Sequence, residues 1–183
     1  MPDLSPPSSA STSAARPLIL GSTSRYRREL LERLRLPFTA IAPLVDETPL
    51  PGEAPLPLAE RLALAKAQAV AAAHPEAIII GSDQVCDLHG QALGKPGTHV
   101  KAVAQLQAMR GHSMVFHTAV AVVCQHSGFC QSHTSQVTVQ FRDLSDAEIE
   151  RYLRLEQPYD CAGSAKSEGL GISLLDAIHS DDP

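Results

Sequence analysis

The sequence contains no tryptophan, and aromatic residues make up only 4% of its 183 residues. Since 44% of the chain is nevertheless hydrophobic, a buried core has to be built from alanine, leucine, valine and isoleucine. No apolar run approaches the roughly 18 residues that a membrane span needs. The net charge of -5 and the lack of stripes of basic and aromatic residues argue against a nucleic-acid binder. We therefore expect a cytoplasmic globular protein that binds neither membranes nor nucleic acids.

The cysteines and histidines also lack the spacings of the common metal and disulfide frameworks. Cys86, Cys124, Cys130 and Cys161 include no C-x-x-C pair, and two disulfides would be an unusual framework for a chain of this length. We expect four reduced and mostly buried thiols. The eight histidines show no H-E-x-x-H or similar spacing, which argues against a zinc site.

The N-terminal stretch is rich in serine, proline and alanine and has neither the basic start nor the apolar core of a signal peptide. We expect a disordered tail over residues 1–16. One ordered domain should follow over residues 17–183, because the length suits a single domain or two closely packed lobes.

Hydrophobic periodicity and capping signals predict an α/β fold in which strands and helices alternate first and a hairpin-rich lobe follows. A capping box at Ser145-Asp146-Ala147-Glu148 should open the last helix, and Asp87 to Gly90 should form a hairpin turn. In the first helix, Leu30, Leu31 and Leu34 should form the apolar stripe. The predicted strands cover residues 18–20, 38–42, 77–85, 114–124, 131–141 and, as a further candidate, 172–175. The predicted helices cover residues 25–35, 58–73, 98–109 and 145–155.

Hydroxyl and guanidinium groups cluster directly after the first predicted strand, in Ser22-Thr23-Ser24-Arg25-Tyr26-Arg27-Arg28. Free backbone N–H groups and hydroxyls at a helix N-terminus bind anions, and arginine adds bidentate phosphate contacts. We therefore take Ser22, Ser24, Arg27 and Arg28 as candidate phosphate ligands. The alternative is an N-cap serine followed by a solvated basic turn.

Carboxylates occur at two places where they could serve catalysis. Asp83 follows the apolar strand Ile78-Ile79-Ile80 in the segment Gly81-Ser82-Asp83-Gln84, and strands of α/β proteins deliver catalytic groups to a cleft in this way. Asp46 and Glu47 lie in a proline-rich loop. Each carboxylate has a simpler alternative, a turn residue for Asp83 and solvated loop charges for the other two.

Lysines and a polar loop complete the candidate site. Lys95 lies in the rigid loop Gly94 to Gly97, where it could reach a phosphate as a point charge, and Lys66 lies on a predicted helix. Gly163 to Gly169 could wrap a ligand or serve only as a flexible connection. Together, the phosphate donors, carboxylates and polar loop are the components of metal-assisted phosphoanhydride hydrolysis.

The ordered set of motifs resembles the Maf family of nucleoside triphosphate pyrophosphatases from about Leu18 to Pro183. The motifs are S-T-S-x-x-R-R, V-D-E, R-L-A-x-x-K-A, I-I-G-S-D-Q-V, G-K-P, F-x-T, V-x-F-R and D-C-A-G-S-x-K-S-E-G-L-G-I. Ser82-Asp83-Gln84 and the Cys161 to Gly169 segment are similar to the subfamily that acts on 7-methyl-GTP. Relatives of the dTTP/UTP type usually carry Ala-Asp-Thr at residues 82–84.

The resemblance implies a mixed, twisted β-sheet flanked by helices, with a smaller second lobe and a central cleft. It also implies a cytoplasmic enzyme that uses Mg²⁺ or Mn²⁺, takes a small nucleotide substrate and is compatible with a homodimer. It gives Asp83 the role of proton acceptor for water that attacks the α-phosphorus. The other implied roles are base specificity for Tyr26, Gln84 and Glu168, phosphate binding for Ser22, Arg27, Lys66 and Lys95, and metal binding for Glu47 with Asp83.

Two departures from the family pattern are visible. Ala165 stands where an aromatic residue is common, and the chain stops at Asp181-Asp182-Pro183, which leads us to expect a C-terminally truncated domain. Two alternative functions stay open from the sequence. One is a dTTP/UTP-type pyrophosphatase of the same family, and the other is a nucleotide-binding regulator of cell division without turnover.

Overall fold

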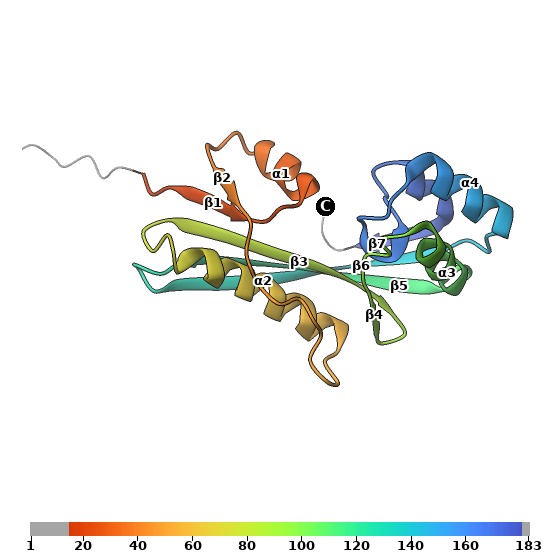
Figure 1. Ribbon diagram of the computed structural model, residues 1–183, viewed down its shortest axis with the longest axis horizontal. Helices are drawn as coiled ribbons and strands as arrows, with labels where there is room; N and C mark the ends of the chain where they lie inside the picture. Colours follow the sequence, from red (N-terminus) through yellow and green to blue (C-terminus); the bar gives the residue numbers. More distant parts are fainter. Residues whose placement is uncertain (1–14, 181–183) are drawn as a thin grey trace, which may run out of the picture.

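The computed structural model describes residues 15–180 (Figure 1). The expected tail up to residue 14 and the end of the chain at residues 181–183 lie outside the described residues. The helices are α1 (Arg25–Glu32), α2 (Pro55–Ala71), α3 (His99–Met109) and α4 (Asp146–Glu156), with short 3-10 helices η1 (Ala162–Ser164) and η2 (Leu170–Leu174). The strands are β1 (Leu18–Gly21), β2 (Thr39–Ile41), β3 (Ile78–Leu88), β4 (Gln91–Leu93), β5 (Ser113–Cys124), β6 (Phe129–Phe141) and β7 (Leu175–Ser180).

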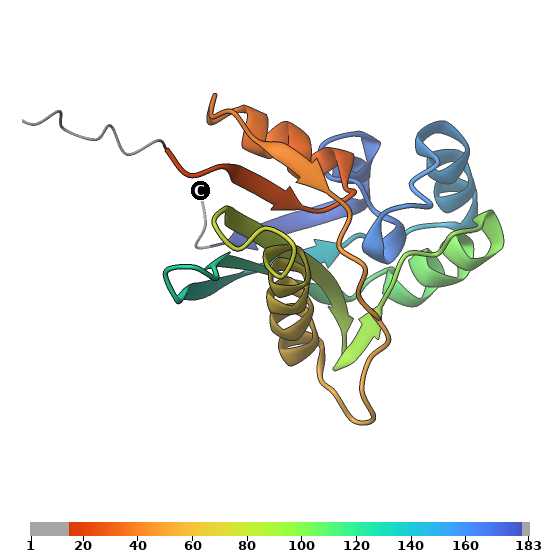
Figure 2. The same cartoon turned by 60° about the vertical axis from the view of Figure 1, so that its left-hand side comes forward.

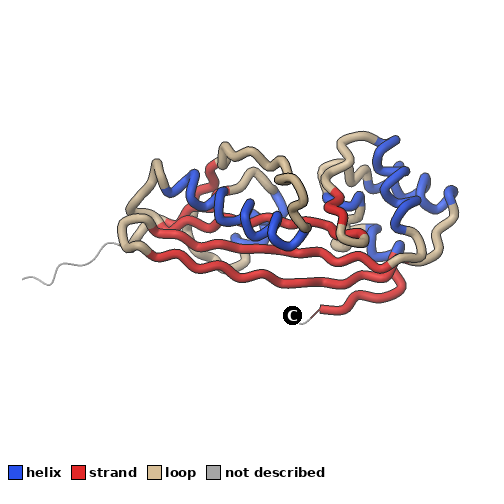
Figure 3. The backbone as a smooth tube through the Cα atoms, turned by 90° about the horizontal axis from the view of Figure 1, so that it is seen from below, coloured by secondary structure: helices blue, strands red, loops and turns tan. Residues whose placement is uncertain are grey.

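All seven strands form one mixed sheet in the order β2-β1-β3-β5-β6-β7, with β4 paired to the end of β3. The β2, β1 and β3 strands run parallel, whereas β5, β6 and β7 are antiparallel to their neighbours. The long strands extend from α2 at one end to α3 and α4 at the other (Figure 3). This architecture confirms the predicted α/β class with a mixed sheet. Among residues 15–180, no helix combines the length and hydrophobicity needed to cross a bilayer.

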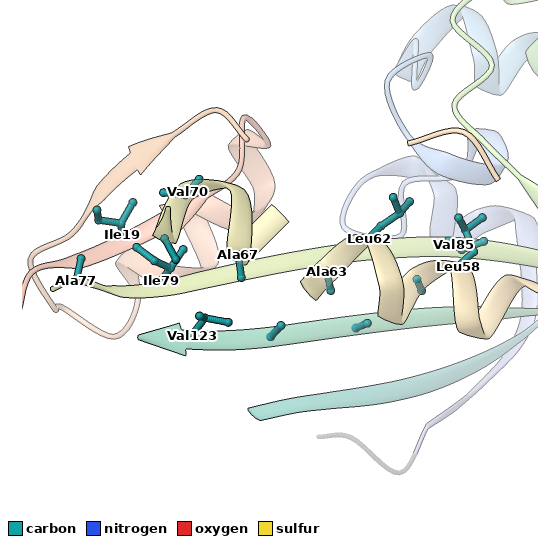
Figure 4. Packing of buried hydrophobic residues seen from close by; sticks show 14 residues of the cluster. Ile19, Leu58, Leu62, Ala63, Ala67, Val70, Ala77, Ile79, Val85 and Val123 are labelled. Atoms are coloured by element: carbon teal, nitrogen blue, oxygen red, sulfur yellow. The ribbon is translucent and has the colours of Figure 1, made fainter. Parts of the chain in front are cut away.

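One hydrophobic cluster lies between α2 and the first half of the sheet (Figure 4). The helix approaches β3 through Ala63 and Ala67, and a Cβ atom on Gly81 would lie 2.3 Å from the Ala63 carbonyl oxygen. It would also lie 2.6 Å from the Ala67 backbone nitrogen. Only glycine at position 81 therefore permits this close packing of helix on strand. The core at this interface is built from small side chains, in agreement with the prediction of a core without large aromatic residues.

A second cluster joins the opposite face of the sheet to α3 and α4, which lie together at one end of the long strands (Figure 2). Phe141, Leu106 and Leu153 are fully buried there. The predicted capping box is confirmed, since the Ser145 hydroxyl accepts from the Glu148 N–H and the Glu148 carboxylate accepts from the Ser145 N–H at 2.8 Å. These helices and the adjacent 3-10 segments form the smaller second lobe.

Several local predictions differ from the structure. The candidate strand at residues 172–175 is wrong, because Leu170–Leu174 forms a 3-10 helix and β7 begins only at Leu175. The Leu175 N–H donates to the Ile172 carbonyl, which keeps the residues before β7 in a 3-10 turn. The α1 helix ends at Glu32, before the predicted residue 35.

The predicted apolar stripe of α1 is buried only at Leu31, whereas Leu30 is 55% and Leu34 is 63% exposed. The four cysteines are free, as predicted, but only Cys86 and Cys124 are buried.

Candidate active site

The candidate site lies where β1 ends beside the middle of β3. The β3 strand pairs with β1 up to Gly81 and with β4 from Cys86 onward. Within the described pairing, residues 82–85 have a neighbouring strand, β5, on one side only. The turn from β1 into α1 therefore faces an open stretch of strand edge, and the residues of both elements meet there.

Strand alternation sends Asp83 and Gln84 to opposite faces of the sheet. Asp83 faces α2, in the same layer as Val85 of the first cluster. Gln84 and Ser82 face a cavity of about 660 Å³. We call this cavity the base-side cavity. The polar part of its lining includes Thr23, Ser24, Arg25, Tyr26, Arg27, Ser82, Gln84, Lys95, Thr118, Lys166 and Glu168. The apolar part includes Phe116, Val137, Val139, Phe141, Leu175 and Ile178.

On the α2 face, one ammonium group bridges two carboxylates. The Lys66 Nζ atom lies 2.6 Å from Asp83 Oδ1 and 2.8 Å from Glu47 Oε1. The Lys66 and Asp83 side chains are 6% and 10% exposed, whereas that of Glu47 is 58% exposed. A buried charge is tolerated only when it is paired, so each of the two buried groups stabilises the other. We call Glu47, Lys66 and Asp83 the carboxylate cluster.

Arg27 connects the carboxylate cluster to the base-side cavity. It lies in the first turn of α1 and lines the cavity, and its backbone N–H donates to the N-cap oxygen of Ser24. Burial lowers the pKa of the Arg27 guanidinium, while the negative charges of Asp83 and Glu47 act in the opposite direction. Arg27 is thus a partly buried cation within electrostatic reach of both carboxylates. The Ser22 hydroxyl is buried and accepts the Ser24 N–H at 3.1 Å, which shapes this turn.

Two cations flank the ring of Tyr26 at the base-side cavity. The Arg25 guanidinium carbon lies 4.7 Å and the Lys166 Nζ atom 5.6 Å from the ring centroid. Arg25 also donates to the Tyr26 hydroxyl at 2.6 Å. Burial raises the pKa of the Tyr26 hydroxyl, and the hydrogen bond from Arg25 opposes that change.

A family comparison adds to this geometry. The sequence profile described as Maf-like protein matches residues 17–183. This chain belongs to the family of Maf-like proteins. Three similar relatives are each named 7-methyl-GTP pyrophosphatase. The relative from Albidiferax ferrireducens is 68% identical over 168 residues, which cover 92% of this chain and 84% of the relative. The relative from Polaromonas sp. is 68% identical over 95% of this chain and 80% of its own length. The relative from Cupriavidus metallidurans is 58% identical over 91% of this chain and 83% of its own length.

In this Maf-like chain, most of the predicted site residues come together. Lys95 is exposed and lines the base-side cavity. Its loop is held at both ends, because the Gly94 carbonyl accepts from the Gln105 amide at 3.0 Å and the Gly97 N–H donates to the Tyr159 carbonyl at 3.0 Å. Arg28 is exposed and does not belong to the described lining, and Glu168 lines the cavity from an exposed loop position.

The sequence reasoning missed Thr118 as a partner of Gln84. The Gln84 amide nitrogen donates to the Thr118 hydroxyl at 2.9 Å, because the register of β3 and β5 places the two residues opposite each other. Lys166 was included only as one residue of the Gly163 to Gly169 loop and of a family motif, without a role of its own. The F-x-T motif at residues 116–118 did mark this strand, but a sequence does not show which residue lies opposite which.

Proposed function

We propose that this Maf-like chain hydrolyses a nucleoside triphosphate to the monophosphate and pyrophosphate, with 7-methyl-GTP as the substrate. The names of the similar relatives support the substrate. The observation that carries the chemistry is the carboxylate cluster, in which Asp83 lies 2.6 Å from Lys66 and within reach of the Arg27 charge. A carboxylate beside two cations can accept a proton from water while the cations stabilise negative charge on a phosphoanhydride.

In the proposed reaction, Asp83 accepts a proton from a water molecule as the water oxygen forms a bond to the α-phosphorus. The bond from the α-phosphorus to the bridging oxygen breaks, and the electron pair leaves with pyrophosphate. Lys66 and Arg27 stabilise the negative charge that develops on the phosphate oxygens. Lys95 binds the outer phosphates from its anchored loop. Ser22 and Ser24 shape the turn whose N–H groups face the anion, and Arg28 contributes positive charge from outside the cavity lining.

The residues of the carboxylate cluster fit a divalent metal. Glu47 and Asp83 both pair with the Lys66 ammonium, at 2.8 and 2.6 Å, so their carboxylates lie close together, and a metal would be held by the carboxylate oxygens that Lys66 leaves free. Carboxylate oxygens are the ligands that Mg²⁺ and Mn²⁺ prefer. No group of three or more His, Cys, Asp or Glu suited to a metal exists among residues 15–180, so substrate phosphates and water would complete the coordination. When bound, such a metal supplies charge neutralisation at the phosphates.

In this proposal, the nucleobase is selected on the face of β3 that carries Gln84, opposite the face that carries Asp83. The Gln84 amide offers a donor and an acceptor to a base edge, and Thr118 fixes its orientation. Tyr26 supplies an aromatic surface, and Glu168 supplies a negative charge that favours the positive charge of 7-methylguanine. Selection and chemistry thus come from adjacent residues of one strand that point in opposite directions.

A panel of triphosphates tests the proposal. Purified chain with Mg²⁺ or Mn²⁺ is expected to release pyrophosphate fastest from 7-methyl-GTP, compared with GTP, dTTP and UTP. Equal rates on UTP and 7-methyl-GTP would overturn the selection by Gln84 and Glu168 and favour the dTTP/UTP type. Tight nucleotide binding without product would instead indicate a regulator. Cytoplasmic location and homodimeric assembly stay predictions, which cell fractionation and size-exclusion chromatography with light scattering would test.

A further inference from the structure

Glu156 occupies a position that its own helix does not explain. It is the last residue of α4, where a negative charge opposes the helix dipole. Its side chain is only 12% exposed. Even so, the pKa of Glu156 is lowered, first by the backbone hydrogen bond from Leu170 and then, against burial, by Lys166. The carboxylate is therefore stabilised by the loop that follows α4 and not by the helix.

Two contacts fasten this loop to Glu156. The Leu170 N–H donates to Glu156 Oε2 at 2.7 Å, and the Lys166 Nζ atom lies 3.2 Å from Glu156 Oε1. The carboxylate comes so close to the backbone that a Cβ atom on Gly169 would lie 2.5 Å from Oε2 and 2.7 Å from Oε1. Glycine at position 169 is thus a condition of the contact.

The loop is also closed on itself. The Lys166 carbonyl accepts the N–H groups of Gly169 at 3.1 Å and Gly171 at 3.0 Å, and the Lys166 N–H donates to the Tyr152 hydroxyl at 3.1 Å. A Cβ atom on Gly171 would lie 2.4 Å from the Lys166 carbonyl oxygen. Residues 166–171 therefore form one compact turn whose position depends on α4.

This turn delivers two charged side chains to the base-side cavity, Lys166 and Glu168. The Lys166 ammonium lies between Glu156 and the ring of Tyr26, 5.6 Å from the ring centroid. Without its carboxylate partner, Lys166 would be an uncompensated cation at the surface proposed to receive a cationic base. Like charges in such a site repel.

We propose that Glu156 is a positioning residue for base selection, a role that rests on the proposed function. It holds the 166–171 turn in place and neutralises Lys166, so that the cavity favours a positively charged purine over its neutral counterpart. Glu156 does not touch the phosphates or Asp83 and takes no part in the hydrolytic step.

The test compares Glu156→Gln and Glu156→Ala with the matched control Glu76→Gln. Glu76 forms an exposed ion pair with His126, outside the cavity lining. The glutamine variant keeps an acceptor for the Leu170 N–H but loses the charge opposite Lys166. We expect its KM for 7-methyl-GTP to rise about tenfold, as for loss of one charge-assisted contact. The KM for GTP should change less, and kcat should stay within about twofold. The alanine variant should show a larger rise in KM, and Glu76→Gln should match the wild type.

Unchanged KM and unchanged discrimination in Glu156→Gln would overturn the proposal. An equal loss of kcat on both nucleotides together with a lower melting temperature would also overturn it, because that pattern indicates a purely structural role. If the wild type does not cleave 7-methyl-GTP, the proposed function fails, and calorimetric binding of 7-methyl-GMP becomes the readout. Weaker binding by Glu156→Gln would then still support the positioning role. A wild type that binds no 7-methylguanine nucleotide would refute both.

Discussion

Lys66 and Asp83 are joined across the interface of α2 and β3, with Nζ 2.6 Å from Oδ1 and both side chains buried. The two residues lie 17 positions apart, on different elements, and Glu47 reaches the same ammonium from the preceding loop. This contact places the proposed proton acceptor in a fixed orientation beside a cation. It also makes stability and catalysis depend on the same pair.

Replacing Asp83 by Asn should reduce turnover of 7-methyl-GTP by about a hundredfold to ten-thousandfold, the usual contribution of a general base. Nucleotide binding should be retained, because Lys66, Arg27 and the cavity remain. Pyrophosphate release and calorimetric binding measure the two effects separately. Asp146→Asn, an exposed aspartate paired with Arg110 in the second lobe, is the control with wild-type turnover. Unchanged turnover in Asp83→Asn would remove the assignment of the base.

Replacing Lys66 by Met should destabilise the fold by about 3–5 kcal/mol, because a buried carboxylate is left without its partner. Chemical denaturation at pH 7 measures the free energy of unfolding. The double variant Lys66→Met with Asp83→Asn removes both charges and should recover a large part of this loss. A double variant no more stable than Lys66→Met would show that the ion pair is not the source of the effect.

Replacing Gly81 by Ala should lower stability by about 1–3 kcal/mol, as expected for overpacking in a core. The added methyl group would lie 2.3 Å from the Ala63 carbonyl and would push α2 away from β3. Since Lys66 belongs to the same helix, activity should fall as well. Gly94→Ala is the control for stability, because a Cβ atom there meets nothing within 4 Å. Thermal unfolding of both variants tests the difference.

The loop that carries Glu47 should respond to acid through Glu53. Hydrogen bonds from Arg61 hold the pKa of Glu53 at about 2, below its ordinary value of 4.5, and Arg61 also donates to the Thr48 carbonyl. A lowered pKa stabilises the fold above the unfolded value, and this stabilisation is lost as pH falls through the folded value. Melting temperatures should therefore drop between about pH 4.5 and 2, and the drop should be smaller in Glu53→Gln. Identical pH profiles of the two proteins would contradict this role.

The cysteines should differ in reactivity in the folded chain. Burial raises the pKa of the Cys86 thiol to about 12, so little thiolate is available for alkylation near pH 8. Cys130 is exposed and should be labelled first by iodoacetamide. Mass spectrometry of peptides after brief labelling, compared with labelling in denaturant, checks the order. Rapid labelling of Cys86 in the native protein would contradict its burial.

Local signals in the sequence were sufficient to predict the features that depend only on neighbouring residues. The Ser145 capping box and the His89-Gly90 hairpin turn, with φ angles of 54° and 83°, each depend on a few consecutive residues. The membership in the Maf-like family was also visible, but the prediction that Asp83 follows an apolar strand was wrong, because Asp83 lies in the middle of the continuous strand β3. The start of β7 was not predicted, because the 3-10 helix Leu170–Leu174, closed by the hydrogen bond from the Leu175 N–H to the Ile172 carbonyl, precedes the strand.

The sequence by itself therefore determined the α/β class, the order of the elements and the chemical types of residue at the site. Only the tertiary structure decided which of these residues meet. Asp83 pairs with Lys66 because Gly81 lets α2 approach β3, and Gln84 pairs with Thr118 because of the register between β3 and β5. Such contacts are fixed by packing between elements distant in the chain, and a one-residue shift in register would send each side chain to the other face of the sheet.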